Sequence, residues 1–306
     1  MEVLAALLVA DPTPLACEGV LEFWARHLAA ASQANAPVDR ALLGGFSADR
    51  VGYAFIAGYE AALASLLGRG GVEGIVSLCA TEQGGAHPRA IEARLEERQG
   101  SLHLQANKRW ATLATVASEL VVLASLGDDA AGRRRLALVR VAREAPGVRV
   151  AKMPDPPFAP EVPHAEVAFE DVVVAPDQLL AGDAWEDDVK PFRTVEDVHV
   201  HAAVLGHAIA LARRAAAPWS IVERLAALAI AVRALAERDP KAATTHVALA
   251  GALSDARALL AELEPSIAAL GAEAAARWTR DRPLLEVASK ARAARAERAR
   301  ERLARG

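Results

Sequence analysis

The spacing of hydrophobic residues changes twice along the chain, and each change marks a different kind of structure. Between Ser47 and Leu67 the apolar residues recur at helical spacing, which predicts a helix that Ser47 caps and that Gly68 and Gly70 end. Its apolar stripe consists of Tyr53, Ile56, Tyr59, Leu63 and Leu66. A second helix is expected at Glu18–Ala31, so the first part of the chain is predicted to be a small helical unit.

From Gly74 to Val174 the pattern alternates, which is typical of half-buried strands. Clusters of glycine and proline separate the candidate strands and predict the turns between them. The candidate strands are Ile75–Ala80, Ser101–Ala106, Glu119–Ala124, Leu136–Val141, Val148–Met153 and His164–Phe169. We therefore expect a compact antiparallel β domain, with the proline-rich residues 154–163 as a rigid excursion on its surface.

After Asp183 the strand pattern disappears, and long segments rich in alanine and leucine follow. The predicted helices are Val195–Arg214, Trp219–Arg238, Ala243–Glu262, Pro265–Arg277 and Pro283–Ala304, with Pro240 and Pro265 between neighbours. Because alanine-rich helices pack closely, we expect an antiparallel bundle. The pattern thus predicts three domains: a helical unit at 1–73, a β domain at 74–182 and a helical bundle at 183–306.

The amino-acid composition limits which kinds of partner and which cellular compartment are expected. The 306 residues are 53% hydrophobic, enough for a large core, and the formal net charge of -4 gives no sign of a nucleic-acid partner. Two cysteines, Cys17 and Cys79, are too few for a disulfide framework, which favours a reducing compartment and predicts a cytoplasmic protein. The apolar run at residues 3–10 follows Glu2 and is much shorter than a membrane span, so we expect no signal and no membrane association.

Several short segments carry candidate chemistry. Thr81 and Glu82 follow the first predicted strand and open a glycine-rich turn, and a Trp-Ala-Thr triplet lies at 110–112. Residues 166–182, EVAFEDVVVAPDQLLAG, and residues 202–206, AAVLG, complete the set. In this order and context the segments resemble the acyl-CoA dehydrogenase family, from about Ser47 to Arg214.

The resemblance implies an α+β fold with a small helical N-terminal unit, a central antiparallel β-barrel-like domain and a C-terminal antiparallel helical bundle. It also implies a flavoprotein oxidoreductase of lipid metabolism that uses FAD for the α,β-dehydrogenation of an acyl thioester. The partner would be an acyl-CoA or an acyl-carrier thioester. A homodimer or homotetramer is expected, because much of the flavin site in this family lies at a subunit boundary.

The resemblance places Thr81, Trp110 and Thr112 against the flavin ring. An indole can stack on a flat ring and short hydroxyls can address its polar edge, although strands also keep such residues for packing alone. Gly84 and Gly85 are expected to bring backbone amides close to the flavin phosphates. The serine and the aspartate that follow in the family pattern are His87 and Pro88 here, which predicts weakened or altered phosphate binding.

Glu196 is the candidate catalytic base. The chain ends before the loop that carries the base in most family members, whereas in others the base lies on the first bundle helix, just before the small-residue segment. Glu196 falls on that position, beside Asp197, where the family has an arginine. Repulsion between the two carboxylates would raise one pKa and favour a base. The alternative is that both residues cap the N-terminus of this helix and complement its dipole.

Two functions remain open from the sequence. The first is a flavoenzyme that oxidises an acyl thioester, with Thr81, Trp110 and Thr112 around the flavin and Glu196 as the base. The second is a non-catalytic, C-terminally shortened homologue that binds acyl thioesters or completes a mixed oligomer with a full-length partner.

Charged side chains on the bundle helices have simpler interpretations. His199 and His201 lie one turn from Glu196 and Asp197, but a diiron bundle needs a second Glu-x-x-His set, so we expect polar helix residues and no metal, with a helical metal site as the weaker alternative. The last helix carries a basic stripe of Arg292, Arg295, Arg298, Arg302 and Arg305. We expect a solvated helix there, with a contact to a CoA phosphate or to another subunit as the alternative.

Overall fold

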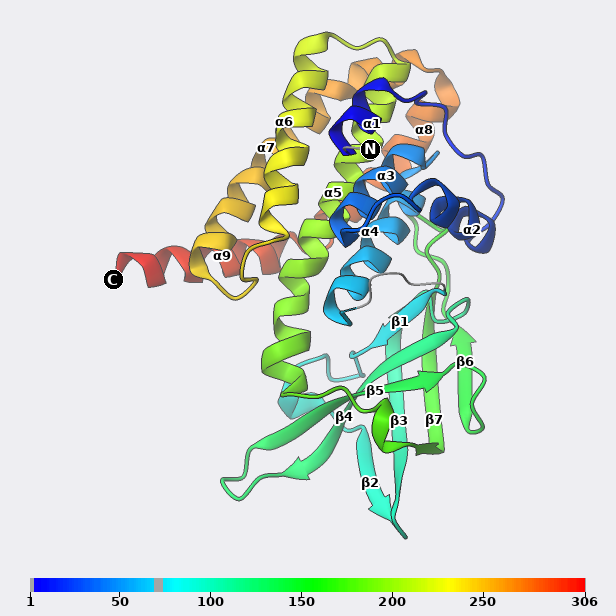
Figure 1. Ribbon diagram of the computed structural model, residues 1–306, viewed down its shortest axis with the longest axis vertical. Coiled ribbons are helices and arrows are strands. Elements are labelled where there is room, and N and C mark those ends of the chain that lie inside the picture. Colours follow the sequence, from blue (N-terminus) through cyan, green and yellow to red (C-terminus); the bar gives the residue numbers. More distant parts are fainter. Residues whose placement is uncertain (1–2, 69–73, 306) are drawn as a thin grey trace. The chain divides into compact units, whose positions relative to one another are not determined.

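The computed structural model describes residues 3–68 and 74–305, and the chain divides into two compact units (Figure 1). Of the described residues, the helical unit consists of 3–68, 156–161 and 192–305. The sheet unit consists of 74–155 and 162–191. The N-terminal helices and the C-terminal bundle therefore belong to the same unit.

The N-terminal part of the helical unit contains α1 (Val3–Val9), α2 (Val20–Ala30), α3 (Pro37–Ser47) and α4 (Val51–Leu66). The predicted stripe of α4 is confirmed, because Tyr53, Ile56, Tyr59 and Leu63 are buried. The predicted cap is wrong: Ser47 ends α3, and Arg50 precedes α4 without a side-chain capping bond. Gly70 lies outside the described residues.

The bundle consists of α5 (Lys190–Arg214), α6 (Trp219–Leu235), α7 (Ala243–Ala269), α8 (Ala272–Asp281), the 3₁₀ turn η4 (Arg282–Glu286) and α9 (Ser289–Ala304). Pro265 was expected to separate two helices but lies inside α7. A proline removes one backbone hydrogen bond, and the exposed position of Pro265 leaves room for its ring. No helix of the described chain has both the length and the apolar character needed to cross a membrane.

Helix α5 packs closely against α3 and α4 through small residues. A Cβ atom added to Gly45 of α3 would lie 1.7 Å from the Ala203 carbonyl oxygen, and one added to Gly58 of α4 would lie 2.6 Å from the Val200 Cα. Glycines therefore allow the backbones of these helices to touch, and the apolar residues around the contacts form the core of the unit.

The sheet unit is built on a seven-stranded sheet. Its strands are β1 (Val76–Cys79), β2 (Arg94–Arg98), β3 (Ser101–Thr112), β4 (Glu119–Asp128), β5 (Arg134–Ala142), β6 (Val148–Lys152) and β7 (His164–Val174). The order is β1-β4-β2-β3-β7-β6, and β5 pairs with β4. The expectation of a purely antiparallel domain is wrong, because β4 is parallel to both β1 and β2.

All six predicted strands exist, and the seventh, β2, was missed. Its sequence, RLEER, has only Leu95 buried, so it carries almost no apolar signal. It forms a hairpin with β3 through Gln99 and Gly100, which both have a positive φ, of 52° and 82°. Two successive positive φ values are the geometry of a tight hairpin turn.

The proline-rich segment is not the surface excursion that the sequence suggested. Its residues 156–161 belong to the helical unit, where Ala159 is fully buried and its amide donates to the Asp281 carboxylate at 2.8 Å. Glu161 accepts hydrogen bonds from Arg50 at 3.2 Å and from Arg280 at 2.7 Å. Half-buried ion pairs and the buried contact of Ala159 with Asp281 hold the segment in place.

Candidate functional site

The structure brings together the three residues that were expected to face a flavin ring. They lie in the sheet unit, where the exit of β1 runs beside β3. The Arg109 amide donates to the Thr81 carbonyl at 2.8 Å, and the Ser77 hydroxyl donates to the Thr112 carbonyl at 2.7 Å. Thr81, Trp110 and Thr112 therefore belong to two neighbouring backbone segments.

Trp110 projects into solvent because β3 contains a bulge. Up to Lys108 the buried residues of β3 occupy even positions, but after the register shift between Lys108 and Ala111 the next buried residue is Ala111. Trp110 lies inside this shift with a φ of 58° and is 55% exposed. A positive φ is energetically unfavourable for a bulky residue, so the backbone at Trp110 is strained. This strained conformation directs the indole outward, and such bulges are frequent beside functional sites.

Two side chains flank the exposed indole. The His164 ring meets it edge to face at 5.9 Å between centroids, and the Arg109 guanidinium lies 5.9 Å from its centroid. A cation at this distance is attracted to an aromatic face. These contacts restrict the orientation of Trp110 while leaving much of its surface accessible.

The two threonines near Trp110 have available hydroxyls. Both Thr81 and Thr112 are half-buried, and within the described part of the chain neither hydroxyl makes a hydrogen bond. A hydroxyl that is partly shielded from water gains from a polar partner. An accessible indole and two unpartnered hydroxyls on adjacent segments form a chemical set that fits a flat ring with a polar edge.

The glycine-rich turn closes on itself. The amide of Glu82 donates to the Gly85 carbonyl at 3.0 Å, and the amide of Gly85 donates to the Glu82 carbonyl at 2.9 Å. Gly85, with a φ of 102°, makes this turn possible. Its amide is therefore engaged, and of the two glycines only Gly84 has a backbone N–H without a hydrogen bond in the described residues.

His87 takes the place of the family's serine with a different donor. Its Nδ1 accepts a hydrogen bond from the Arg89 amide at 3.3 Å, so a neutral His87 carries its proton on Nε2. The exposed ring lies 6.1 Å from the ring of Trp185. Besides the Gly84 amide, the turn thus offers an imidazole N–H to an anion.

A buried ion pair beside this site was not predicted from the sequence. The Lys108 ammonium lies 2.5 Å from the Glu82 carboxylate, and the carboxylate also accepts from the amides of Glu92 and Ala93. Burial lowers the pKa of Lys108, and the hydrogen bond to Glu82 opposes that change. The sequence does contain a sign of this pair: Lys108 follows Leu104 and Ala106 at an inward position of β3, where a charged side chain needs a partner.

In the helical unit, Glu196 and Asp197 lie almost two turns into α5, which begins at Lys190. The interpretation that they cap this helix is therefore wrong. Burial, followed by repulsion from Asp197, raises the pKa of Glu196 to about 7. Glu196 is half-buried and forms no ion pair or hydrogen bond within the described residues, and only the charges of Arg193 and Arg292 favour its ionised form.

Asp197 has a different environment from its neighbour. Arg292 donates to one carboxylate oxygen at 2.8 Å, and Arg295 donates to the other. Both arginines come from α9, so two members of the basic stripe are half-buried instead of solvated. The two adjacent carboxylates on α5 therefore differ: Asp197 is paired with arginines, whereas Glu196 forms no ion pair.

The histidines of α5 bind the backbone of their own helix. Nδ1 of His199 lies 2.8 Å from the Val195 carbonyl, and Nδ1 of His201 lies 2.7 Å from the Asp197 carbonyl. Burial lowers the pKa of both rings, to about 4 for His201. Within residues 3–68 and 74–305 no group of histidine, cysteine, aspartate and glutamate has the arrangement of a metal site. Cys17 and Cys79 are free and buried.

Comparison with known proteins identifies the middle of the chain. Residues 77–172 match the family model described as the acyl-CoA dehydrogenase middle domain. The match runs from the second residue of β1 through most of β7, and it includes Thr81, Trp110 and Thr112. The resemblance predicted from the sequence is therefore confirmed for this part of the chain. No curated protein sequence matches the chain.

Solved structures share the fold at low sequence identity. The FAD complex of PigA has 14% identity and a TM-score of 0.66, covering 99% of this chain and 89% of PigA. FkbI, for biosynthesis of a methoxymalonyl extender unit, has 19% identity and a TM-score of 0.61, covering 99% and 97%. Glutaryl-coenzyme A dehydrogenase in its glutaryl-CoA complex has 16% identity and a TM-score of 0.53, covering 82% and 75%. At these identities the matches show the fold alone.

Proposed function

We propose that this divergent member of the acyl-CoA dehydrogenase family is a flavoprotein oxidoreductase that introduces an α,β double bond into an acyl thioester. The observation that carries the proposal is the strained, exposed Trp110 beside the free hydroxyls of Thr81 and Thr112. Backbone strain of this kind persists where the surrounding structure maintains it, and it is concentrated at functional sites.

FAD fits the residues of the sheet unit. Trp110 would stack against the isoalloxazine ring, and Thr81 and Thr112 would hydrogen-bond to its polar edge. The Gly84 amide and the N–H group at Nε2 of neutral His87 would face the phosphates. When bound, FAD supplies the acceptor for the hydride that leaves the β-carbon of the substrate.

Glu196 is the proposed base. In α,β-dehydrogenation one proton leaves the α-carbon, and a carboxylate whose pKa is near 7 is well suited to take it at neutral pH. The Glu196 carboxylate becomes a carboxylic acid in this step, and its electron pair forms the new O–H bond. If Glu196 is the base, the rate rises with pH through about 7.

The substrate class follows from the family. An acyl-CoA or an acyl-carrier thioester is the proposed partner, since glutaryl-coenzyme A dehydrogenase is seen with glutaryl-CoA. We further propose a homodimer or homotetramer in the cytoplasm.

A flavin-retention experiment tests the proposal. Freshly purified protein should show flavin absorbance, and Trp110→Ala should lose it, whereas Trp219→Ala should retain it. Trp219 is a matched control because its indole is also exposed, at 66%, but lies at the start of α6. Protein that binds neither FAD nor FMN, even on reconstitution, would exclude the enzyme function.

A second function is favoured by one observation in the glycine-rich turn. Since the Gly85 amide already bonds to Glu82, the turn has fewer donors for a pyrophosphate than the family pattern implies. A non-catalytic homologue that binds acyl thioesters or joins a full-length partner in a mixed oligomer is consistent with this loss. Flavin absorbance measured with and without candidate partner subunits separates the two functions.

A further inference from the structure

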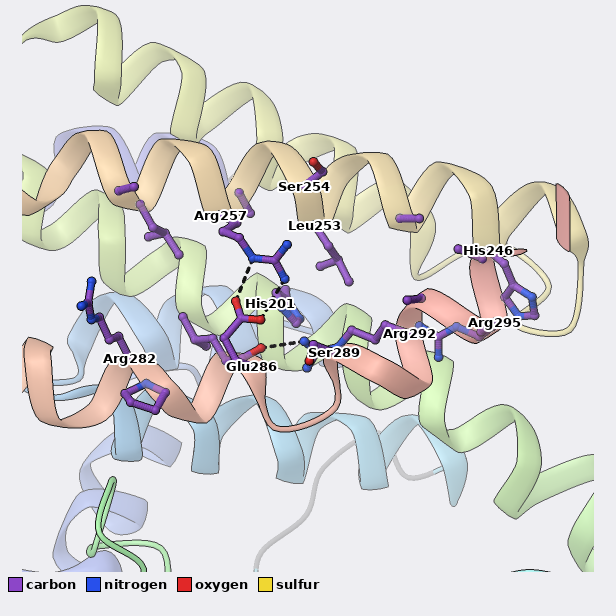
Figure 2. A pocket seen from close by; sticks show the side chains of 18 of the residues that line it. His201, His246, Leu253, Ser254, Arg257, Arg282, Glu286, Ser289, Arg292 and Arg295 are labelled. Carbon is purple, nitrogen blue, oxygen red and sulfur yellow. Dashed lines mark hydrogen bonds and ion pairs between the residues drawn. The ribbon is translucent and has the colours of Figure 1, made fainter. Parts of the chain in front are cut away.

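The helical unit contains a pocket that the proposed flavin chemistry does not use. It has a volume of about 600 Å³ and lies between α7 on one side and η4 with α9 on the other (Figure 2). Figure 2 shows Arg257 of α7 and Glu286 of η4 joined across it, with His201 of α5 behind them. This volume is within the range of small-molecule sites.

The pocket has apolar walls. Helix α7 contributes Leu253, Ala256 and Leu260, and the opposite side contributes Leu285, Ala293 and Ala296. Leu260 and Ala296 are buried, whereas Ala293 is exposed where it lines the pocket. An apolar body of a ligand would replace water along these walls and gain from its own burial.

Positive charges outnumber negative ones in the pocket, because the lining residues include five arginines and two glutamates. At the more exposed side, Arg257 forms a two-pronged pair with Glu286, at 2.8 and 3.0 Å, and both groups are satisfied. Farther in, Arg292 and Arg295 are each only 16% exposed and share the single carboxylate of Asp197. Among the groups that form these ion pairs, the inner corner therefore has one positive charge in excess, in a position partly shielded from water. The neighbouring Glu196 carboxyl, which Arg292 also attracts, has a raised pKa of about 7 and is neutral below that pH.

His201 adds an uncharged acceptor next to that corner. Because a carbonyl oxygen only accepts hydrogen bonds, the contact with the Asp197 carbonyl fixes the proton of His201 on Nδ1. Its Nε2 is then an acceptor, and it makes no hydrogen bond in the described part of the chain although the residue is 6% exposed. A ligand that covers this atom without offering a donor would leave it buried and unsatisfied.

We propose that this pocket binds an amphipathic acid: a carboxylate bound by Arg292 and Arg295, a hydroxyl donating to Nε2 of His201, and an apolar chain along α7 and α9. A planar carboxylate suits guanidinium groups, which donate in a fixed fork. Residues 197 and 201 are one helical turn apart, about 6 Å along α5, so the acid and the hydroxyl lie near the same end of the ligand.

Calorimetric titration of the full chain with 3-hydroxydecanoate, decanoate and decanamide tests this site. We expect 3-hydroxydecanoate to bind one molecule per chain, decanoate to bind at least threefold more weakly, and decanamide at least tenfold more weakly. Arg295→Gln should weaken the hydroxy acid about tenfold, which is the loss expected for one charged hydrogen bond. This variant removes the excess positive charge but keeps the pair of Arg292 with Asp197, so no buried carboxylate is left without a cation.

Matched variants separate the pocket from general effects. Ala293→Phe should fill the pocket and abolish binding of both acids, whereas Ala294→Phe, at an exposed neighbour that does not line it, should leave binding unchanged. His201→Phe should remove the preference for the hydroxy acid. Equal binding of decanoate and decanamide, or equal loss in the two alanine variants, would overturn the proposal. Flavin retention enters none of these measurements, so a failure here is distinct from a failure of the proposed enzyme function.

Discussion

Lys108 and Glu82 form an ion pair inside the sheet unit, with side chains 0% and 6% exposed. Glu82 directly follows Thr81, and Lys108 lies two residues before Trp110. The pair therefore connects the two chain segments that carry the proposed flavin contacts. Because the Glu82 carboxylate also accepts the Glu92 and Ala93 amides, it anchors the glycine-rich turn to the chain that follows it.

Breaking this pair from one side should be strongly destabilising. Lys108→Met leaves a buried carboxylate without its cation, and we expect a loss of about 3–5 kcal/mol in the free energy of unfolding. The double variant Glu82→Gln with Lys108→Met should lose less, because the glutamine is neutral and its carbonyl can still accept the two amides. Urea unfolding of the wild type, the single variants and the double variant measures the coupling. Additive losses would contradict a coupled pair.

The sequence predicted those parts of the fold that depend on local spacing. Helix α4 and the strands β1 and β3 to β7 were found from the spacing of their apolar residues. Burial alternates clearly along β3 and β7, whereas β4 is buried over six consecutive residues and β6 has no buried residue. Strand β2 was missed because its partners supply its backbone hydrogen bonds while its side chains are mostly charged and exposed. Pro265 misled the prediction because the flanking turns of α7 tolerate one missing hydrogen bond.

The site was less predictable because its decisive contacts are long-range. Thr81, Trp110 and Thr112 were found through short motifs, and the structure brings them together. The pairing of Asp197 with Arg292 spans 95 positions of the chain, and that of Glu82 with Lys108 spans 26. Neither spacing is a helical or strand interval, so no periodic pattern marks the partners.

The positive φ at Trp110 predicts that glycine is more stable than alanine at this position. At a φ of 58° a residue other than glycine loses about 1–2 kcal/mol of conformational free energy. The free energy of unfolding of Trp110→Gly should therefore be about 1 kcal/mol higher than that of Trp110→Ala. Both variants lose the indole, and the difference therefore reports the backbone alone. Thermal or urea unfolding of the two proteins without flavin measures it. At Trp219, which begins α6, the glycine variant should not be the more stable one.

Glu196 predicts a pH dependence of stability with a definite sign. The pKa of its carboxyl is raised from 4.5 in the unfolded chain to about 7 in the folded protein, so the fold prefers the protonated form. The contribution of this preference is fully present below pH 4.5 and is lost as the pH rises through about 7. The loss amounts to at most about 3.5 kcal/mol, since one pKa unit corresponds to about 1.4 kcal/mol.

The variant Glu196→Gln isolates this contribution. Glutamine stays neutral, so the variant should match the wild type near pH 4 and become the more stable protein at pH 8. Urea unfolding at several pH values gives the difference in the free energy of unfolding. A difference that stays constant between pH 4 and pH 8 would show that Glu196 titrates normally, and the proposed base would lose its physical support.

The small-residue segment of α5 predicts the effect of a single methyl group. A Cβ atom at Gly206 would lie 2.1 Å from the Leu42 carbonyl oxygen and 3.0 Å from the Phe46 amide nitrogen, both of them backbone atoms of α3. Gly206→Ala must therefore push α3 and α5 apart, and we expect a loss of about 3 kcal/mol in the free energy of unfolding. Gly251→Ala is the matched control, because Gly251 lies within α7 and its Cβ would meet nothing within 4 Å. There alanine should stabilise the protein by up to about 1 kcal/mol, since it is the better helix former. Equal effects at the two positions, measured by urea unfolding, would show that the close contact between α3 and α5 does not limit the size of the residue at position 206.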